Sequence, residues 1–167
     1  MRTSDMLLPE YDQEMAKTRT MLQRVPDNKW AWKPHVKSSS MGQLANHLMN
    51  IPGWLPVTLE TDSLDFAPVG GTAYQSPSAA SNKELLEMFD QAVVAGRAAL
   101  AAADNDNFSK PWTLLQGGHV IFTMPKSACV RSMVLNHLVH HRAQLGVYLR
   151  LNDIPVPATY GPSADES

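Results

Sequence analysis

Four stretches of the chain repeat apolar residues every three or four positions, the spacing that gathers them on one face of a helix. The first runs from about Ser4 to Val25 and ends at Pro26, because the residue before a proline disfavours the α conformation. The second follows Ser39 or Ser40, either of which is a suitable N-cap, and we expect Pro52 and Pro56 to kink or break it.

The third helix is predicted to start at Ser81, which forms a capping-box pattern with Glu84, and to end near Ala103. The fourth covers about Lys126 to Leu151. Before it, WTLLQGGHVIFTMP contains two short apolar runs around paired glycines, the pattern of a β-hairpin. The run from Asp62 to Ser78 has no periodicity and is expected to be a long connection, and the proline-rich C-terminal tail to lie extended on the surface.

Helices with single apolar faces bury those faces most simply against one another. We therefore expect an all-α fold, a four-helix bundle with a small β-hairpin before the last helix. At 167 residues the chain is long enough to bury a core of its own, and residues 1–167 are expected to form a single domain. The lengths of the connections leave the order of the helices open.

Two histidines lie within the most strongly helical segment. His137 and His141 are four residues apart, so they stack on one helix face, and they continue an apolar line through Val134 and Leu145. On this interpretation they point into the core, where a metal ion satisfies both rings while requiring them neutral. His47 lies on the apolar stripe of the second helix and can reach the same core. The spacing therefore indicates a metal site made of His47, His137 and His141.

The alternative for these histidines is structural, since core histidines bonded to a carbonyl or a water are common. His140 competes with His141 as a ligand, but Val134, His137, His141 and Leu145 form the straighter line. His35 lies in a predicted loop and His119 in the predicted hairpin, and we expect both on the surface. The segment HLVHHRAQ lacks the glutamate of H-E-x-x-H, so the general base of zinc peptidases is missing.

Composition narrows the function. The chain has 44% hydrophobic and 18% charged residues, and its 14 basic and 16 acidic side chains give a net charge of −2. No basic cluster is present, which argues against nucleic acid as a partner. No apolar run reaches the roughly 18–20 residues of a membrane span. A single cysteine and an N-terminus without signal-peptide character predict a cytoplasmic location. Cys129 itself is expected to be a small buried hydrophobe rather than a nucleophile.

Three blocks resemble the DinB family, the DNA-damage-inducible-like four-helix bundles related to bacillithiol- and mycothiol-dependent transferases. They are WKPHVKSSSMGQLANHL, PWTLLQGGHVIFTMP and NHLVHHRAQLGVYLRLNDIPVPATYGPSADE, and the resemblance extends over nearly the whole chain. It implies a three-histidine site at His47, His137 and His141, with zinc, nickel or iron as the divalent ion, and often a homodimer. Imidazole accepts all three metals, so the sequence does not choose among them.

The resemblance leads to two hypotheses about function. In the first, the protein is a metal-dependent enzyme, a small-thiol S-transferase or a hydrolase, whose cofactors are a divalent metal and a low-molecular-weight thiol. In the second, it is a non-catalytic binding or scaffold protein that the metal stabilises. Three neutral histidines leave a coordination position open, which is typical of catalytic rather than structural sites. A cavity beside that position favours the first hypothesis, and a metal sealed by side chains favours the second.

Overall fold

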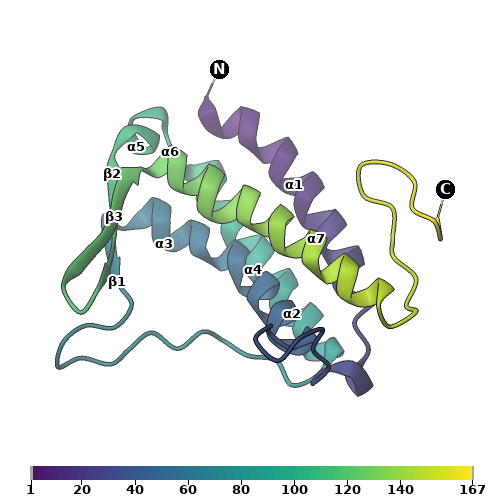
Figure 1. Ribbon diagram of the computed structural model, residues 1–167. Helices are drawn as coiled ribbons and strands as arrows, with labels where there is room; N and C mark the ends of the chain where they lie inside the picture. Colours follow the sequence, from purple (N-terminus) through teal and green to yellow (C-terminus); the bar gives the residue numbers. More distant parts are fainter. Residues whose placement is uncertain (1, 167) are drawn as a thin grey trace.

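The computed structural model describes residues 2–166, which are mostly helical (Figure 1). Helix α1 (Thr3–Leu22) matches the first predicted helix, and the apolar positions of its repeat are buried, among them Tyr11, Met15 and Leu22. A short 3-10 turn, η1 (Asp27–Lys29), follows Pro26. Trp30 then packs against the first turn of the next helix, where a Cβ on Gly42 would lie 2.3 Å from its ring.

The second predicted helix is divided at Pro52, as expected, but not at Pro56. Helix α2 (Met41–Asn50) begins at Ser40, whose hydroxyl accepts a hydrogen bond from the Gln43 backbone N–H while the Gln43 side chain accepts from the Ser40 backbone. The 3-10 turn η2 (Ile51–Gly53) contains Pro52, and α3 (Trp54–Glu60) continues beyond it. The predicted break therefore lies one turn past His47. Pro56 lies in the first turn of α3, where its missing N–H has no helical partner to lose.

The connection after α3 contains structure that its lack of periodicity did not predict. Strand β1 (Ser63–Asp65) pairs in parallel with β2 (Pro111–Gln116), and β2 pairs antiparallel with β3 (His119–Pro125). The expected hairpin is thus present, with positive φ at Gly117 and Gly118, but it is part of a three-stranded sheet. Three residues are too few to show the alternation of a strand. The strand is defined by its pairing with β2, which lies 50 residues away in the sequence.

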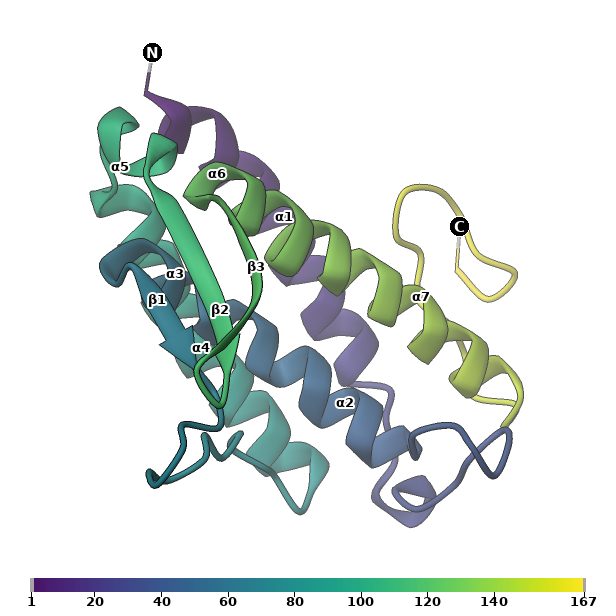
Figure 2. The same ribbon diagram turned by 60° about the vertical axis from the view of Figure 1, so that its left-hand side comes forward.

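Helix α4 (Asn82–Ala102) starts at Ser81 as expected, with the Ser81 hydroxyl accepting from the Glu84 backbone N–H. A short helix, α5 (Asn105–Ser109), lies between α4 and β2, in a stretch for which the periodicity predicts no element. The sheet, α5 and the start of the last helix gather at one end of the long helices (Figures 1 and 2). The long loop between β1 and α4 returns the chain to the other end.

The last predicted helix is continuous but changes its winding. It begins as α6 (Lys126–Cys129), widens into a π-helical segment, η3 (Val130–Asn136), and continues as α7 (His137–Arg150). Helix α7 contacts both α1 and α2, and α4 contacts both of these from the other side. Apolar side chains from all four fill the space between them. None of the helices within residues 2–166 is long and apolar enough to cross a membrane.

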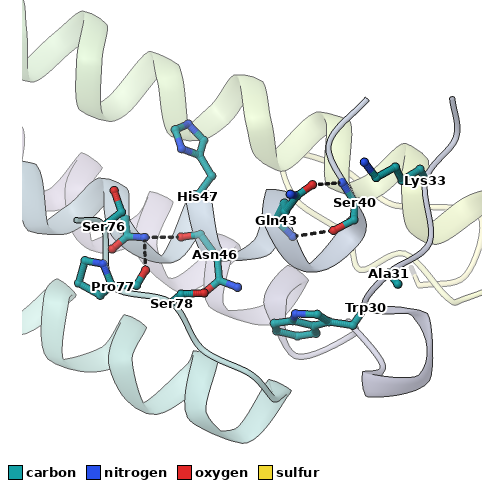
Figure 3. Close-up of a pocket in the computed structure, with 11 residues that line it drawn as sticks. Trp30, Ala31, Lys33, Ser40, Gln43, Asn46, His47, Ser76, Pro77 and Ser78 are labelled. Carbon is teal, nitrogen blue, oxygen red and sulfur yellow. Dashed lines mark hydrogen bonds between the residues drawn. The ribbon is translucent and has the colours of Figure 1, made fainter. Parts of the chain in front are cut away.

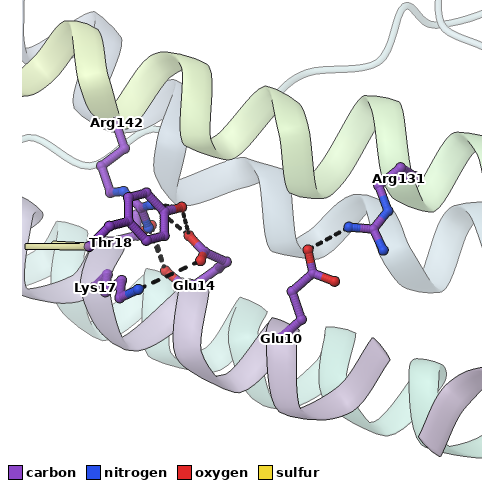
Figure 4. A network of polar contacts seen from close by, with 7 residues as sticks. Glu10, Glu14, Lys17, Thr18, Arg131 and Arg142 are labelled. Atoms are coloured by element: carbon purple, nitrogen blue, oxygen red, sulfur yellow. Dashed lines mark hydrogen bonds and ion pairs between the residues drawn. The ribbon is translucent and has the colours of Figure 1, made fainter. Parts of the chain in front are cut away.

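A buried polar network fixes α7 against α1 (Figure 4). Arg142 is only 2% exposed, and its guanidinium donates to the Glu14 carboxylate at 2.6 Å and to the Thr18 hydroxyl at 3.1 Å. Tyr160, from the C-terminal tail, also donates to the Glu14 carboxylate at 2.7 Å, and the ammonium of Lys17 lies over the Tyr160 ring. The C-terminal tail lies on the surface as expected, but it is not extended: it folds back on itself, since the backbone N–H of Val156 donates to the Asp165 carboxylate. Besides Tyr160, ion pairs of Arg24 with Glu166 and of Arg150 with Asp165 hold it in place.

Candidate metal centre

The structure brings His47, His137 and His141 together between α2 and α7. The Nε2 atom of His137 lies 2.8 Å from Nε2 of His47 and 2.8 Å from Nε2 of His141. The three ligand atoms all lie within 4.8 Å of one another. Figure 3 shows His47 pointing from α2 towards the facing helix. Residues 90 positions apart in the sequence thus present nitrogen atoms to one point.

The cluster lies at the edge of the core, half-buried, and not within it as the apolar line through Val134 and Leu145 predicted. The buried face of the last helix instead follows Val130, Val134, Leu138, Arg142, Leu145 and Leu149. Its first steps of four cross the π-helical segment, which has more residues per turn, and the later steps of four and three are those of an α-helix. His137 and His141 each precede a residue of this face by one position, and so lie beside it, half-buried.

Burial and crowding keep the three rings neutral. Desolvation, followed by the nearness of His141 and His137, lowers the pKa of His47 from 6.5 to about 4. Desolvation also lowers the pKa of His137 and of His141, with His140 adding a smaller effect to each. Around pH 7 all three therefore offer unprotonated nitrogen, which is the form that binds metal ions.

The nitrogen atoms cannot all satisfy one another by hydrogen bonding. A neutral imidazole nitrogen carries either one proton or one lone pair. Nε2 of His137 can therefore form one well-aligned hydrogen bond, to His47 or to His141, and the second contact at 2.8 Å is left without one. A cation that receives all three lone pairs removes this conflict. Three imidazoles are a donor set that zinc, nickel and iron accept, so the residues fit a divalent metal.

Gln144 orients one of the rings. Its side-chain oxygen lies 2.7 Å from Nδ1 of His141, and because a carbonyl oxygen only accepts, this contact places a proton on Nδ1. The lone pair of the neutral ring is then on Nε2, which faces the other two histidines. The amide nitrogen of Gln144 lies 3.1 Å from Nε2 of His140. His140 itself is exposed and lies outside the three-histidine cluster.

An indole ring forms one wall of the cluster. Trp54 meets His47 edge-on, with ring centroids 5.6 Å apart, and meets His137 in the same manner at 5.5 Å. The apolar pattern alone predicts no role at this site for Trp54 or for Gln144. Their spacing could have predicted both contacts. Trp54 follows His47 by seven residues, about two helical turns, and Gln144 follows His141 by three, so each lies on the same side of the chain as its histidine.

Two hollows open onto the histidines. His47 and His141 line a cavity of about 380 Å³, together with Ser38, Ser39, Leu44, Gln144 and Tyr148. His47 also borders a groove of about 580 Å³ that extends past Asn46 to Ser76 and Trp30 (Figure 3). Trp30 packs against the hydrophobic core and also lines this groove. The cluster is thus open to small molecules on two sides.

The remaining candidates lie away from the cluster. His35 and His119 are exposed, as their positions in a loop and in the hairpin predicted. Cys129 is fully buried, and burial raises the pKa of its thiol, so it remains protonated. This agrees with its interpretation as a small hydrophobe.

Comparison with known proteins identifies the family. A sequence model of the DinB family matches residues 1–167. A DinB-like protein from Bacillus cereus ATCC 10987 has a similar structure, with a TM-score of 0.68 and 23% identity over 92% of this chain and 95% of that one. A DinB-like protein from Bacillus subtilis gives a TM-score of 0.68 at 13% identity, over 97% and 99% of the two chains. Comparison with curated proteins produced no match. The chain belongs to the DinB family.

Proposed function

We propose that this DinB family member binds one divalent metal ion, zinc, nickel or iron, through His47, His137 and His141, and that it is a metal-dependent enzyme. The proposed reaction is transfer of a small external thiol to an electrophile, or hydrolysis of a small electrophile. The observation that carries the proposal is the convergence of three neutral Nε2 atoms at the edge of two open hollows.

The surroundings of the cluster support catalysis over a purely structural metal. A divalent ion supplies Lewis acidity, which lowers the pKa of a thiol or water bound to it. The cavity beside His47 and His141 leaves room for such a molecule, with the hydroxyl of Tyr148 and the amide of Gln144 at its wall. Gln144 holds the His141 tautomer, and Trp54 excludes water from one side of His47 and His137. With the Cys129 thiol protonated and buried, we expect the nucleophile to arrive from solution.

Metal content tests the ligand set. The purified protein is incubated with zinc or nickel and then dialysed. It should retain about one equivalent of metal per chain, as measured by inductively coupled plasma mass spectrometry. Alanine at His47, His137 or His141 should reduce retention to well under one equivalent, because two histidines remain. His140→Ala and His119→Ala are matched controls, which should retain the metal since neither ring belongs to the cluster. Full retention in His137→Ala would overturn the proposed site.

Activity tests the reaction class. A metal-loaded sample should consume a small thiol in the presence of one of a panel of electrophiles, or hydrolyse an electrophile. Chelation should abolish the reaction and metal addition should restore it. The cluster joins α2 to α7, so a bound ion would also link two helices, which supports a non-catalytic scaffold as the alternative. A large rise in melting temperature on metal binding, without turnover of any panel member, would favour the scaffold.

Two further proposals concern the domain organisation and the assembly of the protein. We propose that residues 1–167 act as a single domain of the four-helix-bundle type, with α1, α2 and α3, α4 and the last helix as its four members. We also propose a cytoplasmic homodimer with a small-molecule substrate and no nucleic-acid partner. The net charge of −2 supports the last point. Sedimentation of the metal-loaded protein would test the dimer.

A further inference from the structure

A second cavity, separate from the two hollows above, lies between the three-stranded sheet and the helices. It has a volume of about 320 Å³, and its walls come from α3, the sheet, the loop after β1 and the π-helical segment η3. Aromatic rings dominate the lining and come from four elements of the chain. They belong to Trp54, Phe66, Tyr74, Trp112 and Phe122.

The lining carries no charged side chain among the described residues that form it. The polar groups of the lining residues are all uncharged: the hydroxyls of Thr58, Ser76 and Tyr74, two indole N–H groups and the thiol of Cys129, whose raised pKa keeps it protonated. An ion that entered would lose its hydration without gaining a counter-charge, which is strongly unfavourable. The cavity therefore selects uncharged, largely apolar molecules.

The cavity adjoins the histidine cluster. The indole of Trp54 lines it and also packs edge-on against His47 and His137. Ser76 lines it too, and Ser76 borders the groove that contains His47 (Figure 3). A molecule with its apolar body in the cavity can thus present its polar end, past Ser76, to the side of the cluster where His47 lies.

Hydrogen bonds hold the walls in place before any ligand binds. The Asp65 carboxylate accepts from the backbone N–H groups of Gly117 and Gly118, at 3.0 and 2.7 Å, and so ties the loop after β1 to the hairpin turn. The backbone N–H of Tyr74 donates to the carbonyl of Phe66 at 2.8 Å, which closes that loop on itself. A preformed cavity spares a ligand the cost of ordering its binding site.

We propose that this cavity binds the apolar part of the substrate, an uncharged molecule of about two fused aromatic rings with one polar reactive group. The size follows from the volume, since a cavity of about 150 Å³ holds benzene and this one is about 320 Å³. The inference rests on the proposed function, because it assigns the substrate class of the same site. It makes the enzyme a metal-dependent one that acts on hydrophobic aromatic electrophiles.

Calorimetric titration with 2-naphthol and with 2-naphthoate, as uncharged and anionic probes of equal ring size, tests the cavity directly. The wild-type protein should bind 2-naphthol at least about tenfold more tightly than 2-naphthoate. Val57→Phe fills the cavity and should weaken 2-naphthol binding by about tenfold or more. Val94→Phe makes the same change at an exposed position of α4 and should leave binding unchanged.

Titration of the metal-free His137→Ala variant with 2-naphthol tests the cavity independently of the proposed metal site. The variant should still bind 2-naphthol, because the cavity walls do not depend on the metal. Met133→Phe, which fills the cavity from η3, replaces Val57→Phe if the latter does not fold as judged by circular dichroism. Absence of 2-naphthol binding, or equal binding of both probes, would overturn the inference while leaving the metal site standing.

Discussion

The buried ion pair between Arg142 and Glu14 permits a prediction of some precision, because both side chains are almost fully shielded. Arg142 is 2% and Glu14 is 6% exposed. The Arg142→Met variant retains most of the apolar stem but removes the charge. It leaves a buried carboxylate that keeps the Tyr160 hydroxyl at 2.7 Å and the Lys17 ammonium at 3.9 Å as its remaining partners.

Breaking a buried pair on one side typically costs about 3–5 kcal/mol. The two remaining partners of Glu14 argue for the lower end, about 3 kcal/mol. Arg19→Met is the matched control. The Arg19 guanidinium donates two hydrogen bonds to the Asp90 carboxylate and so also joins α1 to a neighbouring helix, but this ion pair is about half exposed. Exposed pairs contribute about 0–1 kcal/mol.

Urea unfolding followed by circular dichroism measures the difference. With a slope of about 1–3 kcal/mol/M, the midpoint of Arg142→Met should fall by about 1–3 M and that of Arg19→Met by much less. The double variant Glu14→Met with Arg142→Met should recover part of the loss, because no charge is then left unpaired in the interior. Equal midpoints for the two single variants would refute the argument that burial makes the Arg142 pair essential.

Two further outcomes follow from the structure. The pKa values of His47, His137 and His141 are lowered in the folded protein, so between about pH 6.5 and 4 the unfolded chain binds more protons than the folded one. The stability of the metal-free protein should therefore fall as the pH is lowered through that window. Urea unfolding at pH 7 and pH 5 should show a smaller loss of stability in a His47→Ala variant. Gly96→Ala should lower the melting temperature although alanine favours helix, because its Cβ would lie 2.6 Å from both the Pro52 carbonyl oxygen and the Tyr11 hydroxyl; an unchanged or higher melting temperature would show that α4 can shift to make room.

Local patterns along the chain were sufficient to predict most of the elements. The capping serines Ser40 and Ser81, the break at Pro52 and the turn at Gly117 and Gly118 are where the sequence placed them, because each depends on a few neighbouring residues. The three histidines predicted as metal ligands do lie together, and their role as ligands stays a prediction. Their spacing and their apolar neighbours were enough to predict that they lie on the faces of two helices that meet.

Tertiary structure decided what depends on residues far apart in the sequence. Strand β1 exists only because β2 offers it a hydrogen-bonding edge, and its three residues show no periodicity of their own. His137 and His141 lie beside the buried face because that face runs through Leu138 and Arg142. Arg142 is buried by its ion pair with Glu14 of α1, a contact that the apolar pattern does not encode. The aromatic cavity beside Trp54 is assembled from residues 54 to 133. Sequence periodicity reports which face a helix buries, whereas a site at the edge of that face is set by how neighbouring elements pack around it.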